Sequence, residues 1–304
     1  MRFLAGALLA GALAGSVLAA PVRPPITGIS HIAVYTADAA ASEDYYVRIL
    51  GARKAPDPED AHGVRYYFSA RQFVEVLPVG PNPGLSRLAH VGWNTPDAAA
   101  LRSYLLAHKY PGVSPLRHVA DGSLWFTTQD PEGNEVQFVQ PASTEAKAEP
   151  GGISGRIIHV GYMVRNREAE DRFYRNLLGF RPYWHGAMKP DATDWISQQV
   201  PDGHDWLEYM MVGPGSTTPL DKVDARQLGV LNHFSLGVKN MEAAVTTLIA
   251  GNRLSPRHDG PSMGRDGKWQ ANLYDPDGTR AELMEFKPVT KPCCSDFTAE
   301  SPSE

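Results

Sequence analysis

The chain has 304 residues, enough for two domains of ordinary size or for one large domain. With 42% hydrophobic and 21% charged residues, its composition is that of a folded globular protein. A net charge of −5 and a pI near 6.1 give no electrostatic footprint for nucleic acid or anionic lipid. We therefore expect a small-molecule partner, with neither nucleic acid nor a membrane as partner of the mature chain. The sequence gives no indication of the oligomeric state.

Residues 1–20 have the pattern of a secretory signal peptide. Arg2 supplies a short positive region, residues 3–18 form an apolar run, and Val17-Leu18-Ala19 offers a small-residue cleavage site. The run is shorter than the roughly 20 residues that span a bilayer, which argues against a retained membrane anchor. We expect cleavage after Ala19 or Ala20 and a secreted or periplasmic protein.

Four stretches of alternating apolar residues each carry a histidine at the same place, which predicts a repeated strand. A helix-like stretch follows each strand, at residues 39–50, 97–108, 167–178 and 241–250. Short β-like runs separated by turn residues follow each helix, so the repeated unit is predicted to be β-α-β-β-β. The four histidine-bearing stretches are 29–34 (His31), 88–93 (His90), 157–162 (His159) and 231–236 (His233).

The four units pair into two halves. His31 and His159 are separated by the same number of residues as Gly51 and Gly179. Each half also closes with an Asp-Pro-x-Gly turn and a following strand. We predict a first domain at 27–141, a linker at 142–155 and a second domain at 156–288.

The two cysteines, Cys293 and Cys294, are neighbours near the end of the chain. A disulfide between neighbours is strained, because Cα atoms about 3.8 Å apart lie below the usual range for a disulfide. We expect residues 289–304 to form a flexible, inert tail, with intermolecular linkage or metal uptake by the cysteines as alternatives.

The second half places two histidines and two glutamates at equivalent positions of its two units. His159 and His233 lie in the opening strands, and Glu208 and Glu282 in the closing strands. If the units pack around a curved sheet, all four side chains project into one concavity. Two imidazoles and two carboxylates suit a divalent ion such as Zn, Ni, Mn or Fe. Any one histidine could instead be an ordinary buried strand residue, but a buried carboxylate needs a partner.

The histidine-bearing repeat and the Asp-Pro-x-Gly endings resemble the vicinal oxygen chelate superfamily, over about residues 28–288. The resemblance implies an α+β fold of four βαβββ modules paired into two similar cup-shaped mixed-sheet domains. By this comparison His159, Glu208, His233 and Glu282 match the His/Glu/His/Glu metal set of glyoxalase I-like sites. Glu208 or Glu282 would then act as the catalytic base in a metal-dependent lyase or isomerase.

The first half offers a second candidate metal site of related composition. Its members are His31, Glu75, His90 and Gln137, the last at the position that corresponds to Glu282. A glutamine can ligate through its carbonyl oxygen but brings no charge, so we expect weaker metal binding. A supporting domain without metal is the alternative.

Two other functions remain open. Extradiol dioxygenases of the same superfamily hold iron with two His and one Glu, which His159, His233 and Glu282 would match. The chain departs from them at Asn272, where they carry Tyr, and near Thr218, where they carry a catalytic His. The third reading is a non-catalytic binder of antibiotic-like molecules. An aromatic-rich stretch, Trp184, His185, Trp195 and Trp206, is expected either to line an organic pocket or to pack in the core.

Overall fold

The computed structural model describes residues 22–81, 86–142, 152–223 and 231–304. The predicted signal peptide and most of the predicted linker lie outside these residues. None of the described helices has both the length and the apolar character needed to cross a membrane.

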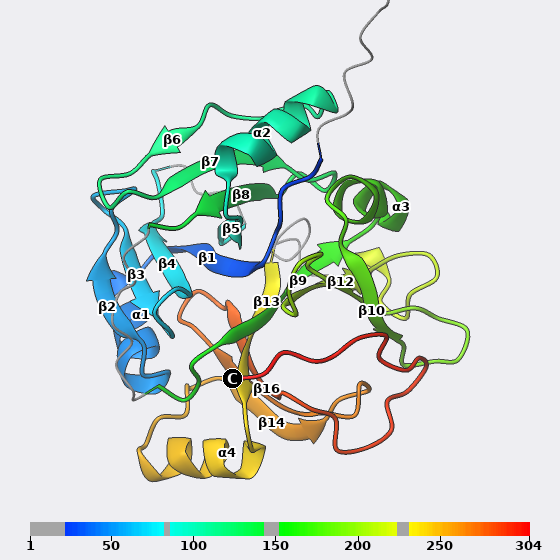
Figure 1. The fold of residues 1–304 in the computed structure, drawn as a ribbon. Helices are drawn as coiled ribbons and strands as arrows, with labels where there is room; N and C mark the ends of the chain where they lie inside the picture. The colour runs from blue at the N-terminus through cyan, green and yellow to red at the C-terminus, as the bar shows by residue number, and fades with distance from the viewer. Residues whose placement is uncertain (1–21, 82–85, 143–151, 224–230) are drawn as a thin grey trace, which may run out of the picture.

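The first half of the chain folds into two β-α-β-β-β units that share one sheet (Figure 1). Its elements are β1 (Gly28–Thr36), α1 (Ala39–Glu43), η1 (Asp44–Ile49), β2 (Arg53–Pro56), β3 (Val64–Tyr67), β4 (Phe73–Pro78), β5 (Leu88–Asn94), α2 (Ala98–Ala107), β6 (Arg117–His118), β7 (Leu124–Gln129) and β8 (Glu135–Gln140).

The second half repeats this order, with one additional 3-10 turn. Its elements are β9 (Ile157–Val164), α3 (Arg167–Asp171), η2 (Arg172–Leu177), β10 (Arg181–Gly186), β11 (Trp195–Gln199), β12 (Trp206–Met211), η3 (Leu220–Lys222), β13 (Leu231–Val238), α4 (Met241–Ala250), β14 (His258–Met263), β15 (Trp269–Tyr274) and β16 (Arg280–Glu285).

Both sheets have eight strands in the same mixed order. The first runs β2-β3-β4-β1-β5-β8-β7-β6, and the second runs β10-β11-β12-β9-β13-β16-β15-β14. In each sheet the two opening strands pair antiparallel at the centre, and each pairs in parallel with the closing strand of its own unit. The predicted α+β fold of paired βαβββ modules is confirmed.

One hydrophobic core serves both sheets. Side chains of both halves belong to the same buried cluster, and Trp93 meets Phe180 edge-on across the halves at 5.1 Å between ring centroids. Along β9, Val160 and Tyr162 face this core, so His159 and Gly161 face the opposite side of the sheet. We call the sides facing away from the shared core the first cup and the second cup.

Two of the predicted helices differ from regular α-helices. Residues 39–50 and 167–178 begin as α-helices but continue as the π-helical turns η1 and η2. The N–H of Leu50 donates to the carbonyl of Tyr45, and Leu178 does the same to Phe173, which are i→i+5 bonds. The hydrophobic periodicity of the sequence does not distinguish a π-helical turn from an α-helical turn, so these turns were not predicted.

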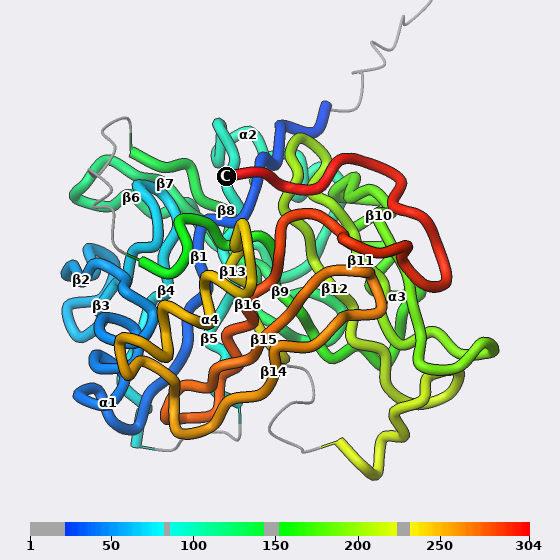
Figure 2. The backbone as a smooth tube through the Cα atoms, turned by 90° about the horizontal axis from the view of Figure 1, so that it is seen from below, coloured from blue at the N-terminus to red at the C-terminus, as the bar shows by residue number. Residues whose placement is uncertain are grey.

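The C-terminal segment, predicted to be a flexible tail at 289–304, packs against the second half of the chain. It runs beside β10 (Figure 2), where the N–H of Thr298 donates to the carbonyl of Tyr183. The ring of Phe297 lies 4.9 Å from that of Tyr183. Cys293 and Cys294 form a disulfide within this segment. The aromatic residues of the second cup supply apolar surface that the segment covers, and composition alone does not reveal this.

Candidate metal centre

The second cup brings together the four side chains that the sequence singled out. His159 and His233 direct their Nε2 atoms at each other at 2.7 Å. An oxygen of Glu282 lies 3.2 Å from Nε2 of His159 and 3.8 Å from that of His233. An oxygen of Glu208 lies 3.5 Å from Nε2 of His233 on the other side. Candidate ligand atoms from four strands therefore surround the two imidazoles, and those of His159, Glu208 and His233 all lie within 4.8 Å of one another.

A glycine makes room for this convergence. Gly161 lies on β9 opposite His233, and a Cβ built there would come within 2.3 Å of the imidazole. In the first cup, Gly92 stands in the same relation to His31, also at 2.3 Å. The repeated His-Val-Gly in β5 and β9 thus supplies a ligand and, two residues later, the space for the partner histidine.

Burial sets the protonation of the second-cup groups. It lowers the pKa of His159 and, together with the charge of Arg280, holds that of His233 well below its usual value. Burial and the neighbouring Glu282 raise the pKa of Glu208 to about 8. Burial would also raise the pKa of Glu282, but the neighbouring His159 brings it below its usual value. Both histidines are therefore neutral near pH 7, as metal ligands require.

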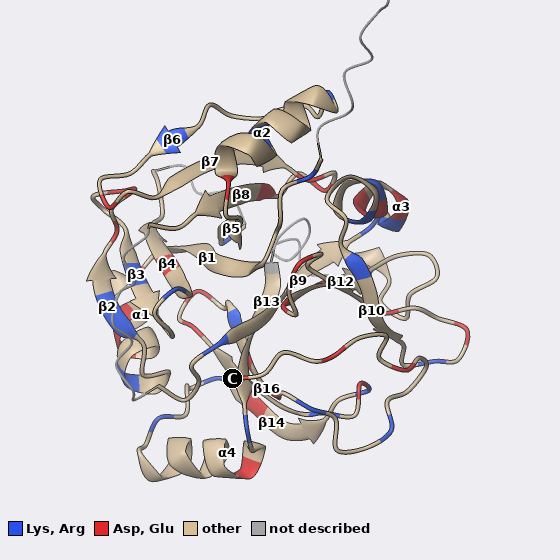
Figure 3. Ribbon diagram, viewed as in Figure 1, with Lys and Arg blue, Asp and Glu red and all other residues tan. Residues whose placement is uncertain are grey.

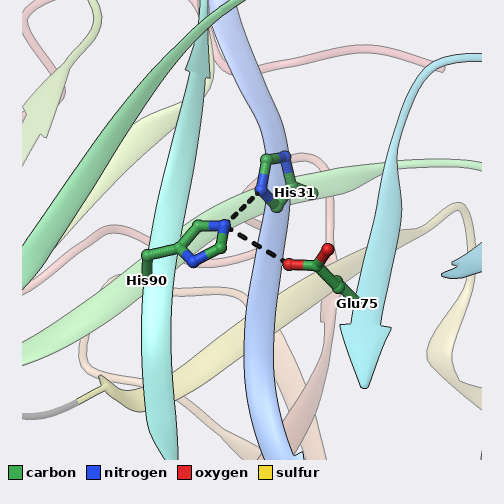
Figure 4. A group of neighbouring side chains, drawn as sticks. All are labelled: His31, Glu75 and His90. Atoms are coloured by element: carbon green, nitrogen blue, oxygen red, sulfur yellow. Dashed lines mark hydrogen bonds and ion pairs between the residues drawn. The ribbon is translucent and has the colours of Figure 1, made fainter. Parts of the chain in front are cut away.

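The first cup repeats the arrangement with His31, His90 and Glu75 (Figure 4). The two Nε2 atoms are 2.8 Å apart, and an oxygen of Glu75 lies 3.4 Å from Nε2 of His90. The Nε2 of Gln137 donates to Glu59, while its carbonyl oxygen is buried without a hydrogen-bond partner among the described residues. Gln137 therefore has a free oxygen beside the histidines.

The first cup contains a buried cation, Arg65. Arg65 binds Asp57 at 2.9 Å and Glu59, and its guanidinium lies 4.4 Å from the centre of the Phe73 ring. Burial and the nearby Asp57 raise the pKa of Glu75 to about 10. The sequence argument did not identify Arg65, although its place on a half-buried strand, two residues before Tyr67, could have suggested an inward-facing cation.

Both donor sets suit a divalent metal ion. Metal–ligand bonds of about 2.0–2.2 Å place neighbouring ligand atoms roughly 3 Å apart, as found here. An oxygen of Glu75 and one of Glu282 are buried without a hydrogen-bond partner among the described residues. Such atoms are costly unless something binds them, and a cation at the convergence point would satisfy them. The chain thus carries two His/Glu groups that can hold a divalent ion.

The four predicted pocket residues do not all line one pocket. Trp206 stacks on His159 at 4.5 Å, directly beside the candidate ligands. Trp184 and Trp195 stack on each other at 6.4 Å. The exposed His185 and Trp184 both line a surface pocket of about 260 Å³, together with Arg167 and Arg175. A bulge between Pro182 and Trp184 shifts the register of β10, which simple alternation does not predict.

Two further cations of the second cup were missed by the sequence argument. The guanidinium of Arg280 lies 2.7 Å from Nδ1 of His233 and also donates to Asn232. Lys268 is fully buried just before β15. Lys268 lies outside every repeated motif, so no pattern pointed to it.

Comparison with known proteins gives consistent matches. Residues 28–138 and 158–267 each match a family model of the Glyoxalase/Bleomycin resistance protein/Dioxygenase superfamily. An iron-dependent extradiol dioxygenase of Rhodococcus jostii (strain RHA1) is 25% identical over 204 residues, or 62% of this chain and 65% of the relative. The chain thus spans about two-thirds of that relative's length.

Solved structures of two dioxygenases share the fold. A catechol 2,3-dioxygenase superposes with a TM-score of 0.61 at 17% identity, covering 93% of this chain and 96% of the other. The 2,3-dioxygenase LapB from Pseudomonas sp. KL28 gives a TM-score of 0.64 at 14% identity, covering 89% and 99%.

Proposed function

Because the chain belongs to the Glyoxalase/Bleomycin resistance protein/Dioxygenase superfamily, we propose that its second cup is the metal centre of an enzyme. The substrate would be a small organic molecule with two adjacent oxygens. The observation that carries this proposal is the convergence of His159, His233 and Glu282, with Glu208 beside them, on one buried point.

Ring cleavage of a catechol-type diol with ferrous ion is the reaction that the relatives favour. The sequence alone favoured a glyoxalase-like lyase or isomerase, but the matched relative is named an iron-dependent extradiol dioxygenase. His159, His233 and Glu282 form the two-His, one-carboxylate set of non-haem Fe(II) oxygenases. Held by these residues, the ion would supply the redox chemistry of a reaction with O₂.

The protein groups around that point would bind and orient the substrate. Trp206, stacked on His159, would give the site an apolar aromatic wall. Glu208, with its pKa raised to about 8, can take up and return a proton at its carboxylate oxygen near neutral pH. Burial of Trp206, His159, His233 and Glu282 would keep water from the reacting oxygens.

A lyase or isomerase is the second candidate, and Glu208 favours it. Its oxygen 3.5 Å from Nε2 of His233 makes a fourth ligand available, beyond the three that a dioxygenase uses. Asn272, which stands opposite Glu282 on the neighbouring strand, also replaces the Tyr expected of a dioxygenase. Glu208 would then be both ligand and base.

The two reactions predict different outcomes for Glu208→Ala. The protein, reconstituted anaerobically with Fe(II), is assayed for bound metal and for oxygen uptake with catechol. In a dioxygenase, Glu282→Ala loses the metal and the activity, whereas Glu208→Ala keeps both within about tenfold. The exposed Glu242→Ala serves as the control.

Other outcomes of the same assays would contradict the dioxygenase. Loss of metal from both variants, with no oxygen uptake by the wild type, would favour the lyase or isomerase. A wild-type protein that binds no metal contradicts both enzymatic functions and leaves the small-molecule binder.

We also propose that the protein is exported. If so, mass spectrometry of the mature protein should find its N-terminus directly after Ala19 or Ala20.

A further inference from the structure

Lys268 is a fully buried lysine in the second cup whose charge has no hydrogen-bonding partner. Its side chain has 0% exposure, and its Nζ has no hydrogen-bond partner among the described residues. Other Lys and Arg residues are scattered over the outer strands, helices and loops (Figure 3). Burying an ammonium without a hydrogen-bonded anion is costly, so this charge lowers the stability of the fold.

Three aromatic rings surround the ammonium. Its Nζ lies 4.7 Å from the centre of the Trp206 ring, 5.0 Å from that of Phe297 and 5.9 Å from that of Tyr183. Ring faces attract a cation but provide no counter-charge. Phe297 belongs to the packed C-terminal segment, which therefore helps to close the cup over Lys268.

The ammonium lies on the metal side of the cup. Lys268 precedes β15, in which Asn272 stands opposite Glu282. Burial lowers the pKa of Lys268 to about 8, although the carboxylates of Asp266, Glu282 and Glu208 act in the opposite direction. An oxygen of Asn272 and one of Glu282 are also buried without a hydrogen-bond partner among the described residues. The second cup therefore holds several unsatisfied polar atoms around one aromatic wall.

The first cup treats its cation differently. There Arg65 lies over Phe73, whose ring stacks on His31, as Lys268 lies over Trp206 beside His159. The guanidinium of Arg65, however, is neutralised by two carboxylates of its own cup. The ammonium of Lys268 has carboxylates nearby, those of Asp266, Glu282 and Glu208, but none of them is hydrogen-bonded to it among the described residues, so its N–H groups remain to be satisfied.

We propose that the ammonium of Lys268 receives an anionic oxygen of the substrate held at the second-cup metal centre. The inference rests on the proposed function and narrows it to an aromatic diol that carries a carboxylate or an ionised hydroxyl. Lys268, held over the ring of Trp206, would donate to the anionic oxygen.

The test is a binding titration of the metal-loaded protein with defined probes. 4-Nitrocatechol presents an ionised hydroxyl, 3,4-dihydroxybenzoate presents a carboxylate, and catechol presents neither at neutral pH. Lys268→Met should weaken binding of an anionic probe by about tenfold or more, as expected for losing a hydrogen bond to a charged group. Lys268→Arg should restore part of the affinity. Lys54→Met, which removes an exposed lysine of the first domain, should change nothing.

Stability provides a second readout that a purely structural lysine would not give. Because Met replaces an unpaired buried charge with apolar volume, Lys268→Met should raise the melting temperature while metal content stays unchanged. Weaker binding of 3,4-dihydroxybenzoate alone assigns the contact to a carboxylate, and weaker binding of 4-nitrocatechol assigns it to an ionised hydroxyl. Either result supports the proposal.

Two results would overturn it. Unchanged affinity for both anionic probes in Lys268→Met removes the role of Lys268 but leaves the metal enzyme intact. A Lys268→Met protein that unfolds shows that the ammonium is structural. Failure of the wild type to bind metal or any diol instead overturns the proposed function together with the inference.

Discussion

Gly161 is not a candidate ligand, but it provides the space that the candidate ligand His233 occupies. The imidazole of His233 occupies the space that a side chain at Gly161 would need, with only 2.3 Å to a built Cβ. Both lie on central strands of the second sheet, where the backbone cannot easily shift.

We therefore expect Gly161→Ala to displace His233 and lower metal affinity by about 10- to 100-fold. Metal titration with a competing chelator measures this. The matched variant Gly92→Ala displaces His31 and reports whether the first cup binds metal as well. Gly80→Ala, with open space around it, is the control. Unchanged affinity in Gly161→Ala would mean that His233 is not a ligand.

At this scale the sequence predicted the candidate ligands but not their surroundings. The repeat identified His159, His233, Glu208 and Glu282, because the two histidines and the two glutamates each occupy equivalent positions in strands of the two units. Lys268 and Arg65 could not be found in the same way, since each occurs once and comes near the ligands only through the pairing of strands.

The C-terminal segment acts as a structural element although it contains neither helix nor strand. Thr298 bonds the backbone of Tyr183, and Arg156 donates to the carbonyl of Ser303. Its polar composition predicted a tail, because the apolar surface that it covers belongs to strands far away in the sequence.

Phe297→Ala tests this segment. Losing a half-buried ring should lower the free energy of unfolding by about 1–2 kcal/mol. It should also admit more solvent to Trp184 and Trp206, which tryptophan fluorescence detects. Val289→Ala, at a side chain with 57% exposure, should leave both measurements unchanged. A mobile tail would give no difference between the two variants.

At the scale of the whole molecule, the two halves are one folding unit. Gln72 of the first half exchanges two hydrogen bonds with the backbone of Ile157 in the second, both at 2.9 Å. The hydroxyl of Tyr174 donates to Asp130 across the same boundary at 3.2 Å. The equal spacing of matching residues in the two halves indicated a duplication. It did not predict how the halves pack, because their interface is formed by side chains from all four units.

Cutting the chain between residues 142 and 152 should therefore leave the halves associated. With a protease site inserted there and cleaved, both fragments should elute together and unfold in one transition, because neither half can cover its share of the common core alone. Tyr174→Phe, which removes the bond to Asp130, should lower the stability of the cleaved complex by about 1 kcal/mol. Fragments that separate under native conditions, each still folded, would instead show two independent domains. In that case each half of the chain would fold without the other, and the candidate metal site of the second cup could be studied in the isolated second half.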